Sequence, residues 1–453
     1  MSRMRQCVFC LLLACSLTAL GARAAETNSI VWNKTTDRVN ADVSSLGLSQ
    51  LLEQITAQTG WRVYVEPGTT RNASAKFKNL PSGEALRMLF GNLNFALVPQ
   101  TNAASRLYVF TTKMQNATRL VHAPGTTAAR RVANELLVKL KPGADIDALA
   151  KLLGAKVVGR NDKLGIYRLQ FGDAAATDAA LGQLQNNSDV ADVDYNYYFD
   201  PPTTPQLLSS APIPPLSLQL NPPGDSGKII VGLVDTGMQS LGPDLDKFIL
   251  KQISVAGDAP ANSSDMTHGT AMAYTILEAI ALAAGGSSSV QILPVDVYGA
   301  NPMTTTWDVA LGIQAVVDKG ATVINLSLGG AGDSSILNNV IQQAIAAGIP
   351  VYAAAGNQPV STPTYPAATP GVIAVTALQN GRIAPYADFG SFVDLALPGT
   401  SVVYFGNQAY LVQGTSTATA NATGVAAGTK GATGWNWTQI DAKMLQKFPV
   451  PAE

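Results

Sequence analysis

The chain has 453 residues, of which 47% are hydrophobic and only 13% are charged, and its net charge is −1. This length predicts about three domains, and the hydrophobic fraction is ample for large cores. A near-neutral chain with so few charges carries no electrostatic footprint for nucleic acid or for anionic lipid, so nucleic-acid binding is excluded.

Residues 1–24 have the composition of a secretory signal peptide. Two arginines precede an apolar run, and the small-residue site Ala22-Arg23-Ala24 follows it. All three cysteines lie here, so cleavage would leave a chain without thiol chemistry and with a net charge of about −4. In an alternative that stays open, Leu12-Leu13-Ala14-Cys15 is similar to a lipoprotein cleavage box, and Cys15 becomes the lipidated first residue. We therefore expect a secreted or periplasmic protein, either released or anchored through Cys15.

Residues 36–114 are predicted to form a small α+β domain. Apolar residues recur at helical spacing from Leu46 to Ile55, Trp61 to Val65 alternate as a strand, and a second helix is predicted over 82–89. Further strands are predicted at 95–98 and 107–110.

The segments Leu48-Ser49-Gln50-Leu51-Leu52 and Phe77 to Leu86 resemble the short N-terminal domain of secretins and TonB-dependent outer-membrane receptors. The resemblance implies a Gram-negative envelope and docking to an envelope protein. The alternative is a small domain that only aids folding.

A polar joint over 116–131 contains His122. The chain has only two histidines, so a histidine metal cluster is effectively excluded and His122 is expected to be a solvated linker residue.

Residues 131–200 follow the strand and helix order of a ferredoxin-like domain. Strands are predicted at 135–141, 155–159, 166–171 and 190–195, and helices at 145–153 and 175–184. The proline-rich joint over 201–224 cannot become a helix or a central strand, so it is a natural exposed cleavage region.

Residues 225–450 are predicted to form an α/β unit. The apolar run from Lys228 to Val234 is typical of a strand buried on both faces of a parallel sheet. Further strands are predicted at 291–297, 322–326, 351–355 and 372–375, and helices at 270–284, 307–319 and 335–347. This alternation predicts a doubly wound parallel sheet with right-handed crossovers, whose reacting groups collect at the C-terminal strand ends.

Four short motifs occur in this unit in one order. They are Val-Asp-Thr-Gly around Asp235, His-Gly-Thr around His268, Ala-Ala-Gly-Asn ending at Asn357, and Gly-Thr-Ser-Thr-Ala around Ser416. Together they supply what acyl transfer requires: an orienting carboxylate, an imidazole base, an amide for an oxyanion and a hydroxyl nucleophile. Singly, each residue could be an ordinary turn or helix cap, but four coincidences in order are improbable.

The order Asp, His, Ser resembles that of the subtilases, the subtilisin-like serine peptidases. The segments from Ile324 to Gly330 and from Tyr365 to Val375 also resemble subtilase core segments. The resemblance covers roughly residues 225–450 and implies a subtilisin-like serine endopeptidase. It makes Asp235, His268 and Ser416 the catalytic triad and Asn357 the oxyanion donor. The implied substrate-binding residues are Ser327, Leu328, Gly329 and Gly330.

The same resemblance gives residues 131–200 a role. A domain directly before a subtilase catalytic unit resembles the family's propeptide, an intramolecular chaperone whose C-terminal tail lies in the active-site groove until it is cleaved. We therefore expect a zymogen whose partners are polypeptide substrates and its own propeptide.

Some positions depart from the family pattern. Tyr274 stands where a glycine is usual, Ala420 where a proline is usual, and Thr417 replaces a common methionine. Asp244 matches a calcium ligand of the family, but one carboxylate does not make a calcium site. No cofactor is therefore expected, and calcium stays open as an alternative that only Asp244 supports. The alternative function is a catalytically impaired, subtilase-like binding protein of the envelope, in which the N-terminal domain carries the role.

Overall fold

The computed structural model describes residues 28–34, 36–66, 69, 71–99, 105–114, 117, 119–121, 129–200, 202–209, 216–222, 227–257 and 265–451. The predicted signal segment, with Cys15, and the linker residue His122 lie outside the described residues. Among the described residues, no helix has the length and apolar character needed to cross a membrane.

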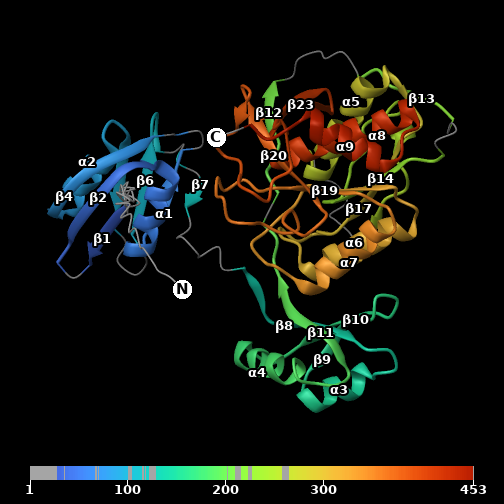
Figure 1. Ribbon diagram of the computed structural model, residues 1–453, viewed down its shortest axis with the longest axis horizontal. Coiled ribbons are helices and arrows are strands. Elements are labelled where there is room, and N and C mark those ends of the chain that lie inside the picture. The colour runs from blue at the N-terminus through green and yellow to red at the C-terminus, as the bar shows by residue number, and fades with distance from the viewer. Residues whose placement is uncertain are drawn as a thin grey trace, which may run out of the picture.

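The N-terminal unit consists of two small sheets and two helices (Figure 1). One sheet has the order β1 (Ser29–Asn33), β2 (Arg38–Gly47), β4 (Asn72–Pro81), and the other the order β5 (Asn94–Val98), β6 (Arg106–Phe110), β3 (Arg62–Val65), β7 (Arg119–Val121). The predicted helices are present as α1 (Leu48–Thr59) and α2 (Ser82–Phe90). Leu51, Leu52 and Ile55 on α1 are fully buried in the core of this unit, as their helical spacing predicts.

The second unit is a four-stranded antiparallel sheet with two helices. Its strand order is β11 (Val190–Tyr197), β8 (Arg131–Leu140), β10 (Ile166–Gln170), β9 (Lys156–Asn161), and its helices are α3 (Ile146–Leu153) and α4 (Ala174–Leu184). This order is that of the predicted ferredoxin-like fold. Leu136 and Val138 on β8 share a core with α3 and α4, whereas Leu137 between them belongs to the core of the third unit. The second unit is therefore docked on the third through the helix-free face of its sheet.

The third unit is built on a parallel sheet, in line with the predicted doubly wound α/β fold. Its strands lie in the order β15 (Ile253–Ser254), β17 (Gln291–Asp296), β14 (Ile230–Asp235), β18 (Val323–Leu326), β19 (Val351–Ala354), β20 (Ile373–Gln379), β21 (Arg382–Ile383), with β22 (Leu395–Pro398) also paired to β20. The pairings are parallel except that of β20 with β21. Helices α5 (His268–Ala284), α8 (Thr415–Thr433) and α9 (Trp437–Lys447) cover one face, and α6 (Thr306–Asp318) and α7 (Ser335–Ala346) cover the other (Figure 1).

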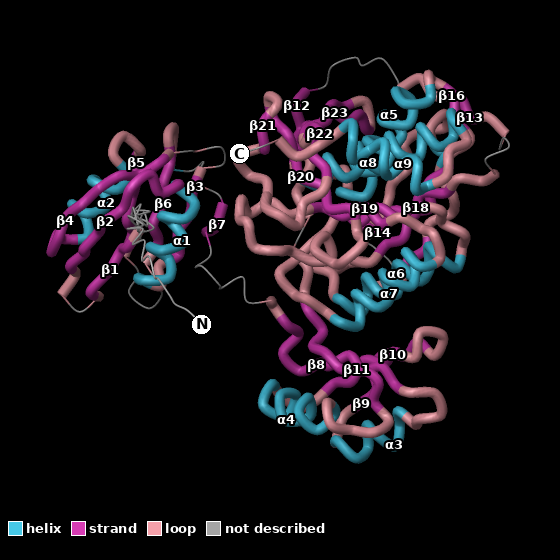
Figure 2. Tube along the Cα trace, in the orientation of Figure 1, coloured by secondary structure: helices cyan, strands magenta, loops and turns pink. Residues whose placement is uncertain are grey.

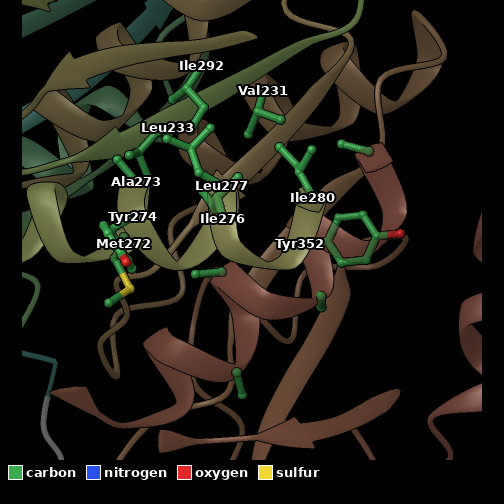
Figure 3. Packing of buried hydrophobic residues seen from close by; sticks show 14 of the residues in the cluster. Val231, Leu233, Met272, Ala273, Tyr274, Ile276, Leu277, Ile280, Ile292 and Tyr352 are labelled. Atoms are coloured by element: carbon green, nitrogen blue, oxygen red, sulfur yellow. The ribbon is translucent and has the colours of Figure 1, made fainter. Parts of the chain in front are cut away.

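Strand β14 is apolar along its length because both of its faces are buried. Val231 and Leu233 pack in the cluster that includes α5 and α8 (Figure 3), whereas Ile230 and Val234 pack in the cluster that includes α6 and α7. Successive side chains point to opposite faces of a strand, so a strand covered on both faces needs apolar residues throughout.

The joint over 201–224 contains two short edge strands that the sequence did not predict. Strand β12 (Gln206–Ser209) pairs with β24 (Gln408–Gln413), which also pairs with β23 (Thr400–Phe405). Strand β13 (Gln219–Leu220) pairs with β16 (Ser287–Ser288), and these two strands lie side by side in Figure 2. Neither strand contains a proline, so the backbone N–H groups of both can form hydrogen bonds with a neighbouring strand. Prolines flank these strands, and proline in sheets is tolerated at the edge.

Candidate active site

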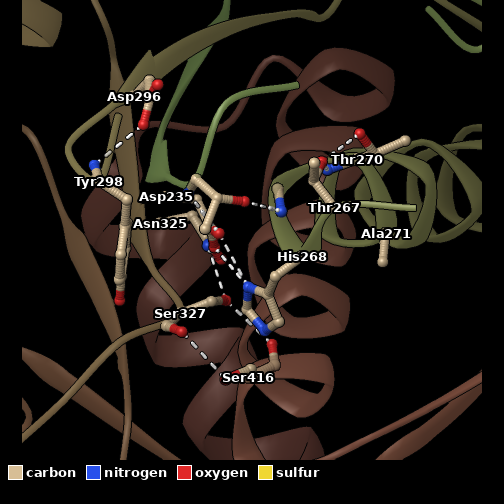
Figure 4. A network of polar contacts seen from close by, with 12 residues as sticks. Asp235, Thr267, His268, Thr270, Ala271, Asp296, Tyr298, Asn325, Ser327 and Ser416 are labelled. Carbon is tan, nitrogen blue, oxygen red and sulfur yellow. Dashed lines mark hydrogen bonds and ion pairs between the residues drawn. The ribbon is translucent and has the colours of Figure 1, made fainter. Parts of the chain in front are cut away.

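Asp235 and His268 meet at the C-terminal edge of the sheet. Asp235 is the last residue of β14, and His268 is the first residue of α5. Nδ1 of His268 lies 2.8 Å from Oδ1 and 3.0 Å from Oδ2 of Asp235, and the two side chains are 3% and 2% exposed (Figure 4). The carboxylate fixes Nδ1 as the protonated nitrogen, so that Nε2 is left as the basic one.

The start of α5 is fixed by its neighbours. Thr267 caps the helix by accepting the N–H of Thr270 at 3.2 Å. Gly269 donates its N–H to Oγ1 of Thr236 at 2.8 Å, and it lies so close to the carbonyl of Thr236 that any Cβ would overlap that oxygen. The glycine of the His-Gly-Thr motif is therefore required by close approach to the residue that follows Asp235.

Ser416 is the second residue of α8 and lies beside His268 (Figure 4). Its hydroxyl donates to the carbonyl of Ser327 at 3.0 Å, while the Ser327 hydroxyl donates to the carbonyl of Ser416, also at 3.0 Å. Nε2 of His268 is buried and has no hydrogen-bond partner among the described residues. The structure therefore brings the three predicted residues together, but the Ser416 hydroxyl faces Ser327 and the predicted bond to His268 is not made in this state.

Asn357 lies in the turn after β19 and faces the start of α8. Its Oδ1 accepts the N–H of Thr415 at 2.8 Å and the hydroxyl of Thr415 at 3.1 Å. Since both bonds hold the carbonyl end of the amide, the NH₂ end is oriented to donate elsewhere. The N–H groups of the first turn of α8 have no carbonyl partner within the helix and add a positive partial charge beside Ser416.

Helices α5 and α8, which carry His268 and Ser416, pack closely. At Gly424 of α8, an added Cβ would lie 2.6 Å from both Cβ of Ala279 and the carbonyl oxygen of Ile276. Tyr274, which departs from the family pattern, is 4% exposed and packs edge-on against Tyr404 of β23 at 6.0 Å between ring centroids. The tyrosine therefore fills the space between α5 and β23. The other two departures, Thr417 and Ala420, are buried within α8.

The predicted substrate-binding residues Ser327 to Gly330 follow β18 directly and are paired with another segment of this chain. Gly329 accepts the N–H of Asp200 at 3.0 Å, and Gly330 exchanges two backbone hydrogen bonds with Tyr365. The segment that contains Asp200 is also paired on its opposite edge, where Phe199 donates its N–H to the carbonyl of Thr304 at 3.0 Å. The end of the second unit is thus inserted as an extra strand between two segments of the third unit.

Several residues of this region were not predicted from the sequence. Thr304 and Thr305 contact the inserted strand through the backbone, which any residue type could do. Asn325 supports Ser327, because its Nδ2 donates to the Ser327 hydroxyl at 2.9 Å and its Oδ1 accepts the Thr423 hydroxyl at 3.0 Å. Asn325 is a polar residue in an otherwise apolar strand, and that contrast is the signal that could have revealed it.

Other carboxylates near the site differ in their surroundings. Asp296 is adjacent to Asp235 in the sheet, and burial raises its pKa. Asp244, which matches a family calcium ligand, is exposed and lies 3.1 Å from the ammonium of Lys247. Over the described residues, no group of three or more metal-binding side chains of the His, Cys, Asp or Glu type is found.

Two parts of the chain match known protein families. Residues 226–448 match the subtilase family, and residues 120–196 match the fervidolysin N-terminal prodomain. A thermophilic serine proteinase of Bacillus sp. (strain AK1) is 32% identical over 313 residues, which cover 65% of this chain and 77% of that protein. The chain belongs to the subtilase family. This subtilase is a serine endopeptidase made as a zymogen, with its own prodomain and polypeptide substrates as partners.

Two further proteins are similar to parts of this subtilase. Thermitase of Thermoactinomyces vulgaris is 36% identical over 202 residues, which cover 43% of this chain and 72% of that protein. The structure of fervidolysin from Fervidobacterium pennivorans, described as a keratinolytic enzyme related to subtilisin, superposes with a TM-score of 0.49 at 22% identity, covering 66% of this chain and 55% of that one.

Proposed function

We propose that this subtilase hydrolyses peptide bonds with Ser416 as nucleophile, His268 as base and Asp235 as the carboxylate that orients it. The observation that carries the proposal is the buried Asp235–His268 pair, which leaves Nε2 beside Ser416 with no hydrogen-bond partner among the residues that the structure describes. As the Ser416 oxygen bonds to the substrate carbonyl carbon, its proton passes to Nε2. The imidazolium then gives that proton to the leaving amine as the peptide C–N bond breaks, and water releases the acyl group by the same route.

Asn357 and the first turn of α8 would stabilise the charge that develops in this reaction. With Oδ1 held by Thr415, the NH₂ group of Asn357 would donate to the oxyanion together with the N–H of Ser416. Ser327, Leu328, Gly329 and Gly330 would bind substrate by strand addition, and the bond between Asp200 and Gly329 supports this assignment.

The Ser416 hydroxyl must leave Ser327 before it can reach His268. A substrate residue that donates its own N–H to the Ser327 carbonyl would take over that acceptor and release the hydroxyl toward Nε2. Binding of an extended substrate would thus complete the triad.

A fluorophosphonate probe tests the assigned chemistry. The Ser416 oxygen would bond to phosphorus as fluoride leaves, a step that needs a working base and oxyanion donors. We expect a single adduct on the peptide that contains Ser416 in processed wild-type protein and none in Ser416→Ala. Processed, folded protein that stays unlabelled would contradict the proposal and favour a binding protein without activity.

We propose that zymogen processing occurs within the joint over 201–224, after the inserted strand. This strand runs antiparallel to Ser327–Gly330 and toward Ser416, because Phe199 lies beside Gly330 and Asp200 beside Gly329. Continued for two more residues, this register would place Pro202 opposite Ser327. Proline has no N–H to donate to the Ser327 carbonyl, so this segment would bind as an inhibitor, and the bond that is cut would lie farther along.

We further propose that the chain is exported to a Gram-negative envelope, as its first 24 residues suggest, and that the N-terminal unit docks on an envelope protein. The resemblance to secretin and TonB-receptor domains supports docking, and the sheet edge offered by β4 is suited to strand addition. Cell fractionation tests both proposals. We expect wild-type protein outside the cytoplasm without residues 1–24, or beginning at a lipidated Cys15, and loss of envelope association when residues 28–121 are deleted.

A further inference from the structure

Asp388 is a carboxylate placed at the turn that carries Asn357. It lies between β21 and β22 and is fully buried. Its Oδ1 accepts the N–H of Gln358 at 2.7 Å and the N–H of Val360 at 3.3 Å. Backbone N–H groups that converge on one carboxylate oxygen make stronger bonds than neutral acceptors would allow.

The backbone of Asp388 holds the same turn. The N–H of Asp388 donates to the carbonyl of Gly356 at 2.9 Å, and the next N–H, that of Phe389, donates to Val360 at 3.1 Å. The carboxylate also fills the space that a side chain at Gly356 would occupy, and Gly356 has a φ of 118°, which favours glycine. Residues 356–360 are therefore fixed on one side by Asp388.

The opposite side of the turn is fixed by the helix that carries the nucleophile. The N–H of Gly356 donates to Oγ1 of Thr415 at 3.1 Å, and Thr415 also binds Oδ1 of Asn357. Asn357 thus lies between two supports, Thr415 and Asp388. Thr415 hydrogen bonds to the Asn357 side chain itself, whereas Asp388 bonds to the backbone from which that side chain projects.

The geometry points to Asp388 as a positioning residue of the oxyanion site, an inference that rests on the proposed role of Asn357. By holding the N–H groups of Gln358 and Val360, the carboxylate keeps the turn in the conformation that aims the Asn357 amide at the substrate carbonyl. An oxyanion donor acts through preorganisation, and a misplacement of about 1 Å can cost about 100-fold in rate.

The test uses three substitutions at Asp388. Asp388→Leu has a similar size and no acceptor, Asp388→Asn keeps one carbonyl oxygen, and Asp388→Ser keeps a hydroxyl. We expect Asp388→Leu to lower kcat by about 10-fold to 100-fold with KM changed by less than about 2-fold, and Asp388→Asn to recover most of kcat. The matched control is Asp394→Asn, since Asp394 accepts the backbone N–H of Ala374 at 2.9 Å and, among the described residues, makes no hydrogen bond to residues 356–360. We expect it to keep wild-type kcat.

A double-mutant cycle with Asn357→Ala separates positioning from a general structural role. If Asp388 acts through Asn357, Asp388→Leu should slow the Asn357→Ala protein by less than about 3-fold. Independent losses that multiply in the double variant, or a lowered melting temperature with unchanged kcat, would overturn the inference. Should Asp388→Leu not fold, the same cycle is run with Asp388→Ser and Asp388→Asn. Wild-type kcat in Asn357→Ala alone would instead remove the role of Asn357 on which the inference rests.

Discussion

At the scale of single residues, the proposed function depends on a few side chains at the ends of secondary-structure elements. Asp235 ends β14, His268 begins α5, and Ser416 lies in the first turn of α8. The ends of elements leave backbone groups unpaired and side chains free to converge, so the sheet edge can assemble residues that lie 181 positions apart.

The first residue-scale prediction concerns Asn357. Asn357→Ala should lower kcat by about 100-fold to 1000-fold with little change in KM, because the donated bond strengthens chiefly in the transition state. Steady-state kinetics on processed protein measures both constants. A rise in KM at constant kcat would assign Asn357 to ground-state binding.

A second residue-scale prediction concerns pH and Glu66 of the N-terminal unit. Hydrogen bonds from Thr112 and Thr111 lower the pKa of Glu66 to about 2 from an ordinary value of 4.5. A carboxylate with a lowered pKa stabilises the folded state above pH 4.5, and this contribution is lost as the pH falls toward 2. Amide exchange at Thr111 and Thr112, whose N–H groups donate to Glu66, should therefore be faster in Glu66→Gln than in wild type at pH 5. The difference should shrink toward pH 2.5, and an equal difference at both pH values would contradict the assignment.

The sequence predicted the residues whose chemistry requires one side-chain type and could not predict those that act through the backbone. Asp235, His268, Asn357 and Ser416 are recognisable because they occur in ordered motifs. Thr304 contributes a carbonyl, which every residue type has. Asp388 occurs in no motif with a known role, and its link to residues 356–360 exists only once β19 and β20 lie side by side.

At the scale of elements, the distance between α5 and α8 sets the distance between His268, the proposed base, and Ser416, the proposed nucleophile. Gly424 lets the two helices approach, because its absent side chain makes room for Ala279 and the Ile276 carbonyl. Glycine in a helix otherwise costs about 1 kcal/mol relative to alanine, so its use here requires a packing reason.

Gly424→Ala should therefore destabilise the protein by about 1 to 3 kcal/mol. It should also lower kcat, because α5 must shift away from the added methyl group and carries His268 with it. Gly431→Ala is the matched control in the same helix, where an added Cβ would meet its nearest atom at 3.6 Å. It should be neutral or stabilising. Urea unfolding and kcat compare the two variants, and equal effects would show that helix approach does not limit the site.

The inserted strand makes another element-scale prediction. Pro202→Ala supplies an N–H opposite the Ser327 carbonyl, so it should free the Ser416 hydroxyl and create a new cut next to residue 202. Pro205→Ala, three residues beyond, is the control and should leave the processing bond unchanged. The mass of the released catalytic fragment identifies the bond. An unchanged fragment in Pro202→Ala would contradict the register proposed for this strand.

At the scale of the whole molecule, periodicity predicted the doubly wound sheet and the ferredoxin-like unit, since both depend on patterns within single segments. Strands β12 and β13 could not be predicted, because their pairing partners lie 205 and 68 residues away at the first paired positions and their own sequences are short. Docking of the second unit through Leu137 could not be predicted either. Apolar residues on both faces of a strand show that both faces are buried, but not which unit covers each face.

The most direct test of the central claim, a zymogen activated by its own Asp235–His268–Ser416 triad, is a paired expression of wild type and Ser416→Ala followed by intact mass measurement. Ser416→Ala is a small change at a buried position and should fold with the prodomain docked. Wild-type protein should lose everything up to a bond within 202–224, leaving a fragment of about 230 to 250 residues, because the bond is held near the nucleophile at high effective concentration. Ser416→Ala should keep the prodomain and differ from the full chain only by the segment removed on export. A Ser416→Ala protein that is purified and cut at the same bond, or an active wild type that is never cut there, would contradict the claim.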